Sequence, residues 1–491
     1  MSGAMASIGQ TGETEASLDD VAGLDTTHVG GDLATPVEAL ISRPLLFVEP
    51  DATVAETART MRDAGTSWVL VADEPPGIVT DRDLRSRVLA ADLDPHTPVR
   101  AVMSRPLRSL PADTTVLGAL LWRLEQGFHH LPLTRGGRIA GVVTDTDLLR
   151  HQATNPLALL RRIEALDSGS DALAGYAREV ASVAEALLIG GLDVLQIARV
   201  IATLNDTLTA RLLRRAENTL GPPPCPYTWL VLGSGGRMEQ VLLTDQDNAL
   251  AYLEGDEDTR AYFAALAGHV VDGLIAAGFP PCPGGYMATN WCRSLAEWRV
   301  LFRRWVDVPE PQALLQAEVF MDFRAVHGEL DLVPLDAILA SAGGRDLFLH
   351  QLARAALTFR SPLRAFGRLR RDRGTIDLKA GGIAAIVMLA RLHALAARAT
   401  PRPTLERLDA AAQAGTLSRA GAEELADTFR FLTRLRLREQ LRSLAAGAPL
   451  GNRVDPDALS AFERRRLKEA LRAVGHQQEA TRLRFRTTEV G

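Results

Sequence analysis

The chain has 491 residues, a length that predicts about three domains of roughly 100–200 residues each. Hydrophobic residues make up 46% and charged residues 23%, so a globular core can form without disulfides or structural metals. The net charge of −5 argues against nucleic acid as a partner, and the longest apolar run, Gly381 to Ala390, is far short of the ~20 residues of a membrane span.

The N-terminus and the cysteines both favour a cytoplasmic location. The N-terminus lacks a basic stretch followed by an apolar core, which argues against a signal peptide. The three cysteines (Cys225, Cys282 and Cys292) are too few for a disulfide framework and match no zinc spacing. We therefore expect free thiols in a cytoplasmic protein without a membrane partner, with a redox pair of Cys282 and Cys292 as the alternative.

Residues 1–35 are rich in small and polar side chains without apolar periodicity, which predicts a disordered tail. Two similar units follow over 36–152. Each contains a helical segment, a short apolar strand, and a second strand that ends in Gly-h-Val-Thr-Asp-x-Asp-Leu, where h is apolar. The two signatures begin at Gly77 and Gly141, and both units also repeat a Ser-Arg-Pro lead-in. The matched pair predicts a tandem β-α-β-β-α repeat.

The rest of the chain divides at changes in pattern. Residues 153–222 show apolar positions at helical spacing, which predicts a helical connector that ends at the proline-rich stretch from Gly221. Residues 223–342 mix strands and helices, and residues 343–491 predict an almost entirely helical domain. From residue 361 onward the chain has 25 Lys and Arg but only 14 Asp and Glu. This positive excess could attract phosphates or an acidic partner, and the alternative is that the arginines lie on solvated helix faces.

The chemistry-bearing residues cluster between Thr228 and Tyr252. A short buried strand is predicted over 229–232. Gly233-Ser-Gly-Gly236 then predicts a sharp turn with little side chain to block a ligand. The next helix is expected over 237–243, with N-terminal amides that could bind phosphate oxygens. The sequence Asp245-Gln-Asp247 opens the next apolar strand.

Two acids at positions i and i+2 share one face of a strand. This pairing is costly unless a cation joins the carboxylates, and Mg²⁺ takes one or two carboxylates together with substrate phosphates. In a two-metal site, one ion activates the attacking oxygen and the other stabilises the leaving pyrophosphate. Taken alone, the glycine segment indicates an ordinary turn rather than a phosphate-binding loop. Taken alone, the Asp-x-Asp pair indicates exposed surface residues rather than metal ligands. Together, with an 11-residue gap from Ser234 to Asp245, they predict nucleotidyl transfer from a nucleoside triphosphate (NTP).

These patterns resemble known families. The segment from Gly233 to Leu250 resembles nucleotidyltransferases of the DNA-polymerase-β superfamily, in particular the branch that contains the PII-protein uridylyltransferases. The two repeats resemble a CBS-domain pair, and the whole order resembles a bacterial family that joins such a pair to a nucleotidyltransferase. The resemblance implies an α+β multidomain fold: a CBS pair (36–152), a helical connector (153–222), a polymerase-β-like domain (223–342) and an all-α C-terminal domain (343–491).

The resemblance also implies a third carboxylate on a later strand. A strand is predicted over the apolar run 319–326, and Asp322 lies inside it. A buried acid needs a partner or a metal, so Asp322 is expected to hold Mg²⁺ together with Asp245 and Asp247. A structural salt bridge between Asp322 and Arg324 is the alternative.

Further NTP-binding residues are implied by the resemblance. Lys379 lies in an Asp-Leu-Lys-x-Gly-Gly signature, where a triphosphate-binding lysine is expected and a surface charge is the alternative. Asn290 ends a loop that the family places beside the active site, although the sequence alone shows only a loop. The expected NTP-binding residues are Gly233, Ser234, Gly235, Arg237, Asn290 and Lys379.

CBS domains carry a Thr/Ser-x-x-Asp motif in which the hydroxyl faces a nucleotide phosphate and the acid accepts from the ribose hydroxyls. The matching pairs here are Thr80 with Asp83 and Thr144 with Asp147, which implies up to two adenine-nucleotide sites. CBS pairs commonly pack face to face, so a homodimer through the pair is expected.

The function expected from these features is a Mg²⁺-dependent nucleotidyltransferase, uridylyl- or adenylyltransferase-like, that adenine nucleotides regulate through the CBS pair. The resemblance suggests a small regulatory protein such as PII as the acceptor. One alternative is a catalytically silent nucleotide-sensing signalling protein. The other is an RNA-directed nucleotidyltransferase, which the basic C-terminal helices suggest.

Overall fold

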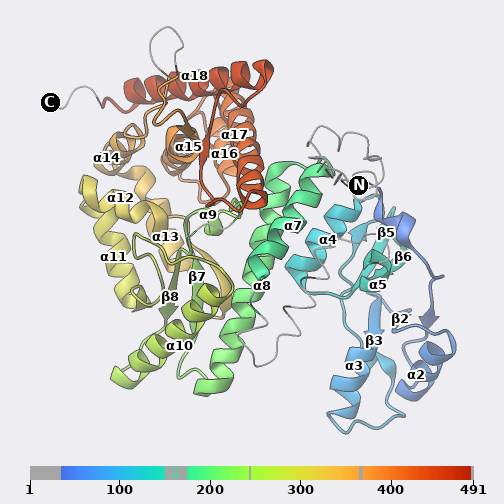
Figure 1. Ribbon diagram of the computed structural model, residues 1–491. Helices are drawn as coiled ribbons and strands as arrows, with labels where there is room; N and C mark the ends of the chain where they lie inside the picture. The colour runs from blue at the N-terminus through green and yellow to red at the C-terminus, as the bar shows by residue number, and fades with distance from the viewer. Residues whose placement is uncertain are drawn as a thin grey trace, which may run out of the picture. The chain divides into compact units, whose positions relative to one another are not determined.

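A computed structural model describes residues 35–149, 159, 163, 173, 175–242, 245–363 and 369–487 (Figure 1). The expected tail up to residue 34, and residues 150–174 of the repeats and the expected connector apart from residues 159, 163 and 173, lie outside the described residues. The chain forms two compact units: the first contains the two repeats and the second contains nearly all of the chain beyond them.

The first unit confirms the tandem repeat. In each copy the first strand pairs in parallel with the second, and the second pairs antiparallel with the third. The first copy contains η2 (Val37–Leu40), β1 (Phe47–Val48), α2 (Val54–Asp63), β2 (Trp68–Val71), β3 (Gly77–Thr80), α3 (Asp81–Asp83), η3 (Leu84–Leu89) and η4 (Val99–Ala101). The second contains β4 (Leu110–Pro111), α4 (Val116–Gln126), β5 (His130–Arg135), β6 (Arg138–Thr144) and α5 (Asp145–Leu149).

Strand β2 holds the two copies together because it is buried along its whole length. Val69 and Val71 pack in a cluster with Met61 of α2. Trp68 and Leu70 alternate with them and pack with Val142 of the second copy. Both faces of β2 are therefore apolar, which explains why its sequence lacks the alternation of a half-exposed strand.

The second unit is built around a four-stranded mixed sheet in the order β10-β7-β8-β9. Strand β7 pairs antiparallel with β8 and β10, and β8 pairs in parallel with β9. The elements before the C-terminal domain are α7 (Tyr176–Ile189), α8 (Val194–Leu220), β7 (Tyr227–Val231), α9 (Gly233–Gly236), β8 (Asn248–Tyr252), α10 (Glu257–Ala276), β9 (Cys292–Ser294), α11 (Leu295–Asp307), α12 (Pro311–Phe320), β10 (Arg324–Gly328) and α13 (Val333–Ser341).

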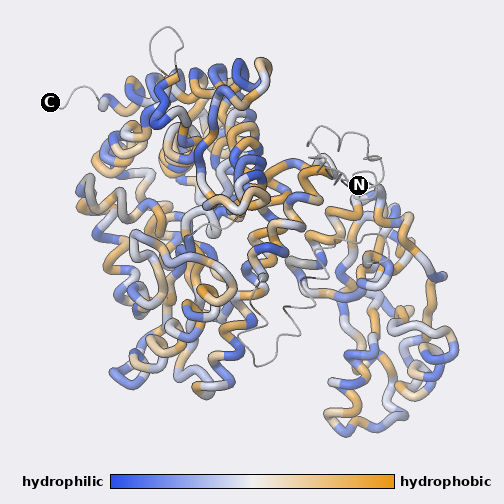
Figure 2. The backbone as a smooth tube through the Cα atoms, viewed as in Figure 1, coloured by the Kyte–Doolittle hydropathy of each residue, from blue (hydrophilic) through white to orange (hydrophobic). Residues whose placement is uncertain are grey.

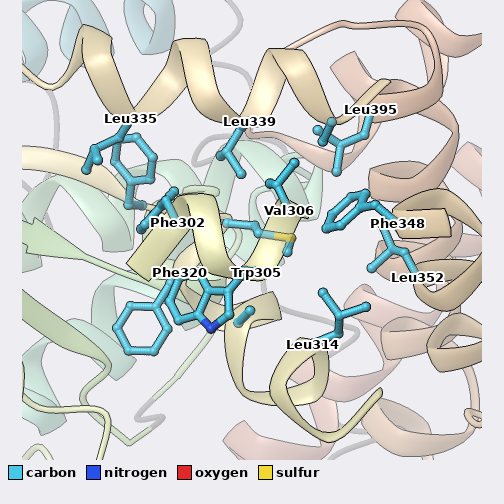
Figure 3. Packing of buried hydrophobic residues seen from close by; sticks show 14 of the residues in the cluster. Phe302, Trp305, Val306, Leu314, Phe320, Leu335, Leu339, Phe348, Leu352 and Leu395 are labelled. Atoms are coloured by element: carbon cyan, nitrogen blue, oxygen red, sulfur yellow. The ribbon is translucent and has the colours of Figure 1, made fainter. Parts of the chain in front are cut away.

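Each face of this sheet is covered by different helices. Leu230, Ala249 and Ala251 point to a core formed with the helices from α11 onward, where aromatic and aliphatic side chains converge (Figure 3). On the opposite face Tyr252 stacks on Phe263 of α10, with ring centroids 4.9 Å apart. The alternation of neighbouring residues between the two faces is the two-residue period of a strand.

The C-terminal domain is helical, as expected, with one added two-stranded ribbon. It contains η6 (Ala342–Gly344), α14 (Asp346–Ala356), β11 (Ile376–Asp377), η8 (Lys379–Ile383), α15 (Ala384–Ala396), α16 (Thr404–Gln413), α17 (Arg419–Ala445), β12 (Arg453–Val454) and α18 (Ala461–Arg484). Along most of its helices hydrophobic and hydrophilic residues alternate, as amphipathic packing requires (Figure 2).

Helix α15 departs from this alternation because it is the central helix of the domain. Among the described residues, one segment, Lys379–Ala396, has the length and mean hydropathy (1.4) of a helix that could cross a membrane. The protein itself buries 78% of that segment, and α15 residues such as Ile386 and Leu389 pack in the core between the neighbouring helices. The apolar composition of the segment is thus the composition that a buried core helix needs.

Candidate active site

The glycine segment after β7 forms a helical turn of its own. The amides of Gly236 and Arg237 donate to the carbonyls of Leu232 and Gly233, at 3.0 and 3.1 Å. The helix expected over 237–243 is therefore wrong for the described part of that range, which is a turn followed by irregular chain, with Met238 in the left-handed region (φ 57°). As in any first helical turn, the amides of residues 233–235 have no acceptor within the helix.

Two of these glycines are required by the close approach of two acids. Gly233 has a positive φ (53°), and a Cβ there would lie 3.2 Å from Oδ2 of Asp247. A Cβ on Gly236 would lie 1.6 Å from the backbone oxygen of Asp322, which no other residue could tolerate. The turn thus brings the backbone into direct contact with both acids.

Asp245 and Asp247 lie side by side, as predicted. One oxygen of each and the sulfur of Cys282 are within 4.8 Å of one another. Oδ1 of Asp247 is buried and has no hydrogen-bond partner. Burial raises the pKa of Asp247 to about 6, with the hydrogen bond from Cys282 opposing the rise and the charge of Asp245 adding to it. Burial also raises the pKa of Cys282 to about 11, so the thiol is a neutral donor to Asp247.

Asp322 does not join this pair, and its expected role as a third metal ligand is corrected. It lies in the turn between α12 and β10, so the strand expected over 319–326 is a helix end, a turn and a strand start. The side chain is fully buried, and its carboxylate accepts from Arg237 and from Arg391 (Nη2–Oδ2 2.5 Å). It also pairs with Arg407 (Nη2–Oδ1 2.7 Å).

Three guanidinium groups thus occupy both oxygens of Asp322 and leave no lone pair turned to a metal ion. Burial alone would raise the pKa of Asp322, but Arg391, Arg407 and Arg237 outweigh it and hold the pKa well below its usual range. Glu239 extends the network, because it accepts from Nε of Arg237 at 2.7 Å and from the hydroxyl of Thr404 at 2.9 Å. Asp322 is therefore the anchor of a buried network that joins the sheet to the C-terminal helices.

Arg324 has a different partner from the one considered in the sequence. Instead of Asp322 it pairs with Asp206 of α8, through Nη1 and Nη2 at 2.8 and 3.0 Å. Nη2 also donates to the carbonyl of Gly235 at 3.1 Å. Arg324 therefore ties the glycine turn to a helix 118 residues away in the sequence.

An open cavity of about 900 Å³, a volume that includes solvent at its mouth, connects the glycine turn with the C-terminal domain. Five of the residues expected to bind NTP or metal line it together with further side chains. Its basic lining residues are Arg237, Lys379, Arg391 and Arg436, and its acidic ones are Asp247, Glu239 and Glu318. Gly233, Ser234 and the apolar side chains of Phe359, Val387 and Phe429 complete much of the wall.

Two residues expected at the NTP site lie elsewhere. Asn290 is exposed, and its amide donates to the carbonyl of Gly285 in its own loop at 3.0 Å. Within the described part of the chain, it lines neither this cavity nor the smaller one beside it. Gly235 lines the smaller cavity. Asn290 therefore closes its loop rather than facing the triphosphate side of the site.

The sequence did not mark Arg407 or Arg436, and it marked Arg391 only as a weaker candidate than Lys379, because each of these arginines comes from a different helix. Arg391 lies on α15, Arg407 on α16 and Arg436 on α17. Arginines are frequent throughout this domain, so no local motif marks these three. One signal was available: Arg391 interrupts an otherwise apolar helix, and a buried arginine needs an acidic partner.

In the first unit the Thr-x-x-Asp motifs form helix caps. The hydroxyl of Thr80 donates to Asp83 Oδ2 at 2.7 Å, and the hydroxyl of Thr144 donates to Asp147 Oδ2 at 2.6 Å. The other oxygen of Asp147 accepts from Ser42 at 2.5 Å. The lead-in of the first copy thus supports the motif of the second, and each acid is already hydrogen-bonded within the protein.

Family models match most of the chain. The model described as "Putative nucleotidyltransferase DUF294" matches residues 178–312, and "Putative nucleotidyltransferase substrate binding domain" matches residues 346–485. The CBS domain model matches twice, at residues 37–90 and 99–154. The order of the three models is the order that the sequence predicted.

Individual relatives match about a quarter of the chain. An uncharacterized 17.7 kDa protein of Acidianus ambivalens is 32% identical over 24% of this chain and 73% of that protein. An uncharacterized protein of Methanopyrus kandleri is 32% identical over 22% of this chain, which spans 58% of that protein. A solved CBS-domain containing protein from Agrobacterium tumefaciens is 25% identical over 24% of this chain and 94% of that one, with a TM-score of 0.23.

Proposed function

This chain belongs to the family that joins a CBS pair to a DUF294 nucleotidyltransferase domain and its C-terminal substrate-binding domain, and on that premise we propose that it transfers a nucleoside monophosphate from an NTP to an acceptor with the help of Mg²⁺. One observation carries the proposal. Asp247 is a half-buried carboxylate with one buried oxygen that has no partner, and together with the glycine turn it lines a cavity rich in arginine.

The residues present fit a divalent cation. Asp245 and Asp247 offer hard oxygen ligands within reach of one another, and the unpartnered Oδ1 of Asp247 is a buried acceptor that needs a donor or a cation. The sulfur of Cys282 lies beside these oxygens, and its thiol donates a hydrogen bond to Asp247. Bound Mg²⁺ would supply charge neutralisation at the triphosphate and activation of the attacking oxygen.

The cavity supplies the remaining parts of an NTP site. Arg237, Lys379, Arg391 and Arg436 line it and offer positive charge to a triphosphate. The amides of residues 233–235, which have no acceptor within the turn, would donate to phosphate oxygens. The apolar stretch with Phe359 offers a surface on which a nucleobase can rest. The protein's own work is therefore to hold and orient the triphosphate before attack.

The network around Asp322 supports this task. Asp322 accepts from Arg237 and Arg391, which also line the cavity. Their guanidinium groups are also held by Glu239 at Arg237 and lie 3.8 Å from Glu318 at Arg391, so these arginines would lose little rotational freedom when they meet a phosphate. Asp322 thus acts in the proposal as a positioning residue for two phosphate-binding arginines rather than as a metal ligand.

The CBS pair adds regulation to the proposal. Thr80 with Asp83 and Thr144 with Asp147 would contact the phosphate and ribose of an adenine nucleotide, and binding there would change turnover at the distant site. We further propose a uridylyl- or adenylyltransferase specificity, a protein or small-molecule acceptor such as a regulatory protein, a homodimer through the CBS pair, and a cytoplasmic location.

Incubation with α-³²P-labelled NTPs and Mg²⁺ tests the proposal. The full-length protein should release pyrophosphate, and Asp245→Asn/Asp247→Asn should lower the rate by about 1,000-fold, a loss of roughly 4 kcal/mol. Asp258→Asn, at the exposed start of α10, is the matched control and should keep the wild-type rate. An unchanged rate in the double variant would exclude Asp245 and Asp247 from the reaction, whereas NTP binding without turnover in the wild type would favour the silent sensor instead.

A further inference from the structure

Glu318, near the end of α12, is an acid that the proposed function leaves unused. It lines the cavity of about 900 Å³ between the glycine turn and the C-terminal domain, called the NTP cavity from here on. The other acids that line this cavity are Asp247, which belongs to the expected metal site, and Glu239, which accepts from Arg237 and Thr404. The inference drawn from Glu318 rests on the proposed function.

One oxygen of Glu318 needs a donor that the protein does not supply. Oε2 is buried and has no hydrogen-bond partner among the described residues, although the side chain as a whole is 21% exposed. Nη1 of Arg391 lies 3.8 Å from Oε2, beyond hydrogen-bond distance, and donates to the sulfur of Met388 at 2.7 Å. Burial raises the pKa of Glu318, and the charge of Arg391 opposes the rise. A buried oxygen left in this state indicates a donor that a ligand brings.

A second unpartnered group lines the same cavity from the C-terminal domain. Thr433 of α17 is 2% exposed, and its hydroxyl has no hydrogen-bond partner within the described structure. A threonine inside a helix can donate to the carbonyl four residues earlier, as Thr203 and Thr209 of α8 do at 2.8 Å. Helices from both domains, α12 and α17, therefore carry an unsatisfied polar atom at one cavity, as a site for a polar ligand would.

A metal ion is not the partner that Glu318 needs. Among the described residues, the group with metal-ligand spacing consists of Asp245, Asp247 and Cys282. Glu318 is outside this group, so a cation bound by the paired acids would leave Oε2 of Glu318 without a partner.

The charge and the position of Glu318 decide which part of an NTP it can meet. A carboxylate only accepts hydrogen bonds and repels phosphates, so its partners in an NTP are the ribose hydroxyls or the N–H groups of the base. The neighbouring Val319 lies against the glycine turn, because a Cβ on Gly233 would be 3.7 Å from Cγ1 of Val319. In an NTP the ribose is bonded to the α-phosphate and the base lies beyond it. A carboxylate close to the phosphate-binding turn therefore meets the ribose first.

We propose that Glu318 accepts hydrogen bonds from the 2′- and 3′-hydroxyls of the NTP ribose and thereby selects ribonucleotides over deoxyribonucleotides. Two neighbouring hydroxyls match the two oxygens of one carboxylate, which can accept from both at once. The hydroxyl of Thr433 binds a further polar atom of the same nucleotide. Both residues act on the affinity and the orientation of the NTP, and neither exchanges a proton with it.

Equilibrium binding of α,β-methylene-ATP, α,β-methylene-UTP and their 2′-deoxy forms in Mg²⁺ tests the proposal, because each pair differs in one hydroxyl. For the base that binds more tightly, wild type should prefer the ribonucleotide at least about 10-fold, which corresponds to about 1.4 kcal/mol. Glu318→Gln removes the charge and one acceptor, so it should lower this preference to about 2-fold, mainly by weakening the ribonucleotide. Equal weakening of the ribo and deoxy forms would place Glu318 against the base or the phosphates and overturn the ribose contact.

Glu439 of α17 offers a matched control. Its side chain is 19% exposed, close to the value for Glu318, and it lines neither the NTP cavity nor the smaller one beside it. Glu439→Gln should therefore keep the wild-type preference for the ribonucleotide. Thr433→Val keeps the shape of the side chain without the unpartnered hydroxyl, so it should weaken both forms of the analogue about 5-fold. Unchanged affinity in Thr433→Val overturns the assignment of Thr433 to the site.

The comparison in wild type does not depend on the folding of any variant. If wild type binds the ribo and deoxy forms equally, the ribose contact is overturned and the proposed function stands. If wild type binds none of the four analogues, the proposed function itself is overturned.

Discussion

Asp247 and Asp322 are two acids that lie just before strands β8 and β10 of the same sheet, and their surroundings differ. Asp322 is fully buried with three arginines on its two oxygens. Asp247 has another acid and a neutral thiol as its neighbours and one oxygen without a partner. The pKa of Asp322 is accordingly held low by Arg391, Arg407 and Arg237 against its burial, whereas burial raises that of Asp247.

The difference shows how a structural acid can be told from a ligand acid. A carboxylate whose charge is already balanced by the protein has no need of a metal ion, whereas a buried carboxylate beside a second acid does. The sequence alone could not make this distinction, because both acids follow or interrupt apolar runs. Substitutions in the two environments should therefore differ in their effects on stability and on ligand affinity.

The largest effect is expected at Asp322. Asp322→Asn leaves three buried arginines short of a counter-charge, which should lower the free energy of unfolding by about 3–5 kcal/mol. Urea denaturation measures the loss. Asp409→Asn removes an exposed ion pair with Arg419 and should cost less than about 1 kcal/mol. A comparable small loss in both variants would mean that the arginines do not depend on Asp322.

Asp322 also predicts a dependence on pH. Its folded-state pKa is depressed, so its stabilising effect is complete above the unfolded-state pKa of about 4 and is lost as the pH falls below that value. The stability difference between wild type and Asp322→Asn should therefore be constant from pH 5 to 7 and shrink below pH 4. A difference that instead grew on acidification would contradict the assignment of Asp322 as an ionised anchor.

The next effect is expected at Arg324, which holds the glycine turn through Gly235. Arg324→Lys cannot keep both the bidentate pair with Asp206 and the bond to the carbonyl, so the KM for NTP should rise about 10-fold while kcat falls less. Arg345→Lys, at an exposed pair with Asp307, is the control and should leave both constants unchanged. Steady-state kinetics with varied NTP distinguishes loss of positioning from general unfolding, which would lower the active fraction alone.

A smaller effect is expected at Lys379, an exposed side chain at the rim of the NTP cavity. Lys379→Met should weaken NTP binding about 5-fold. The difference in NTP affinity between wild type and Lys379→Met should become smaller as salt is added, because salt screens the lysine charge. Lys468, the other lysine of the chain, lines neither cavity, and Lys468→Met should bind like wild type. Equal affinities in the two variants would remove Lys379 from the site.

The smallest effect on stability is expected in the CBS pair. Thr144→Val loses both a helix cap and the expected contact with a nucleotide phosphate, so it should lose about 1 kcal/mol of stability and bind adenine nucleotides more weakly. Thr53→Val removes a similar capping box from α2 and should lose only the stability. Calorimetry with AMP and ATP separates the two. Unchanged nucleotide affinity in Thr144→Val would exclude the second motif as a ligand site.

Local patterns predicted the repeats and the paired acids because they depend on neighbours in the sequence. The period of strands and the repeated signature placed β3 and β6 correctly, and the spacing of Asp245 and Asp247 placed their carboxylates together. The helix expected after Gly236 failed because the glycines themselves form the turn.

The partners of Asp322 could not be predicted for a different reason. Arg237 is 85 residues away in the sequence and Arg391 is 69 residues away, on a separate domain. Many arginines of the C-terminal domain were equally available by composition. Only the packing of α15 against the sheet domain selects among them, and one sequence carries no signal for that choice.

The central claim is that Asp247 is a metal ligand, and Mn²⁺ binding observed by electron paramagnetic resonance tests it most directly, because Mn²⁺ shares the preference of Mg²⁺ for oxygen ligands. In the presence of a non-hydrolysable NTP, wild type and Asp258→Asn should bind Mn²⁺ at least about 10-fold more tightly than Asp247→Asn, a difference of about 1.4 kcal/mol. Equal Mn²⁺ affinity in wild type and Asp247→Asn, with both proteins folded, would contradict the account.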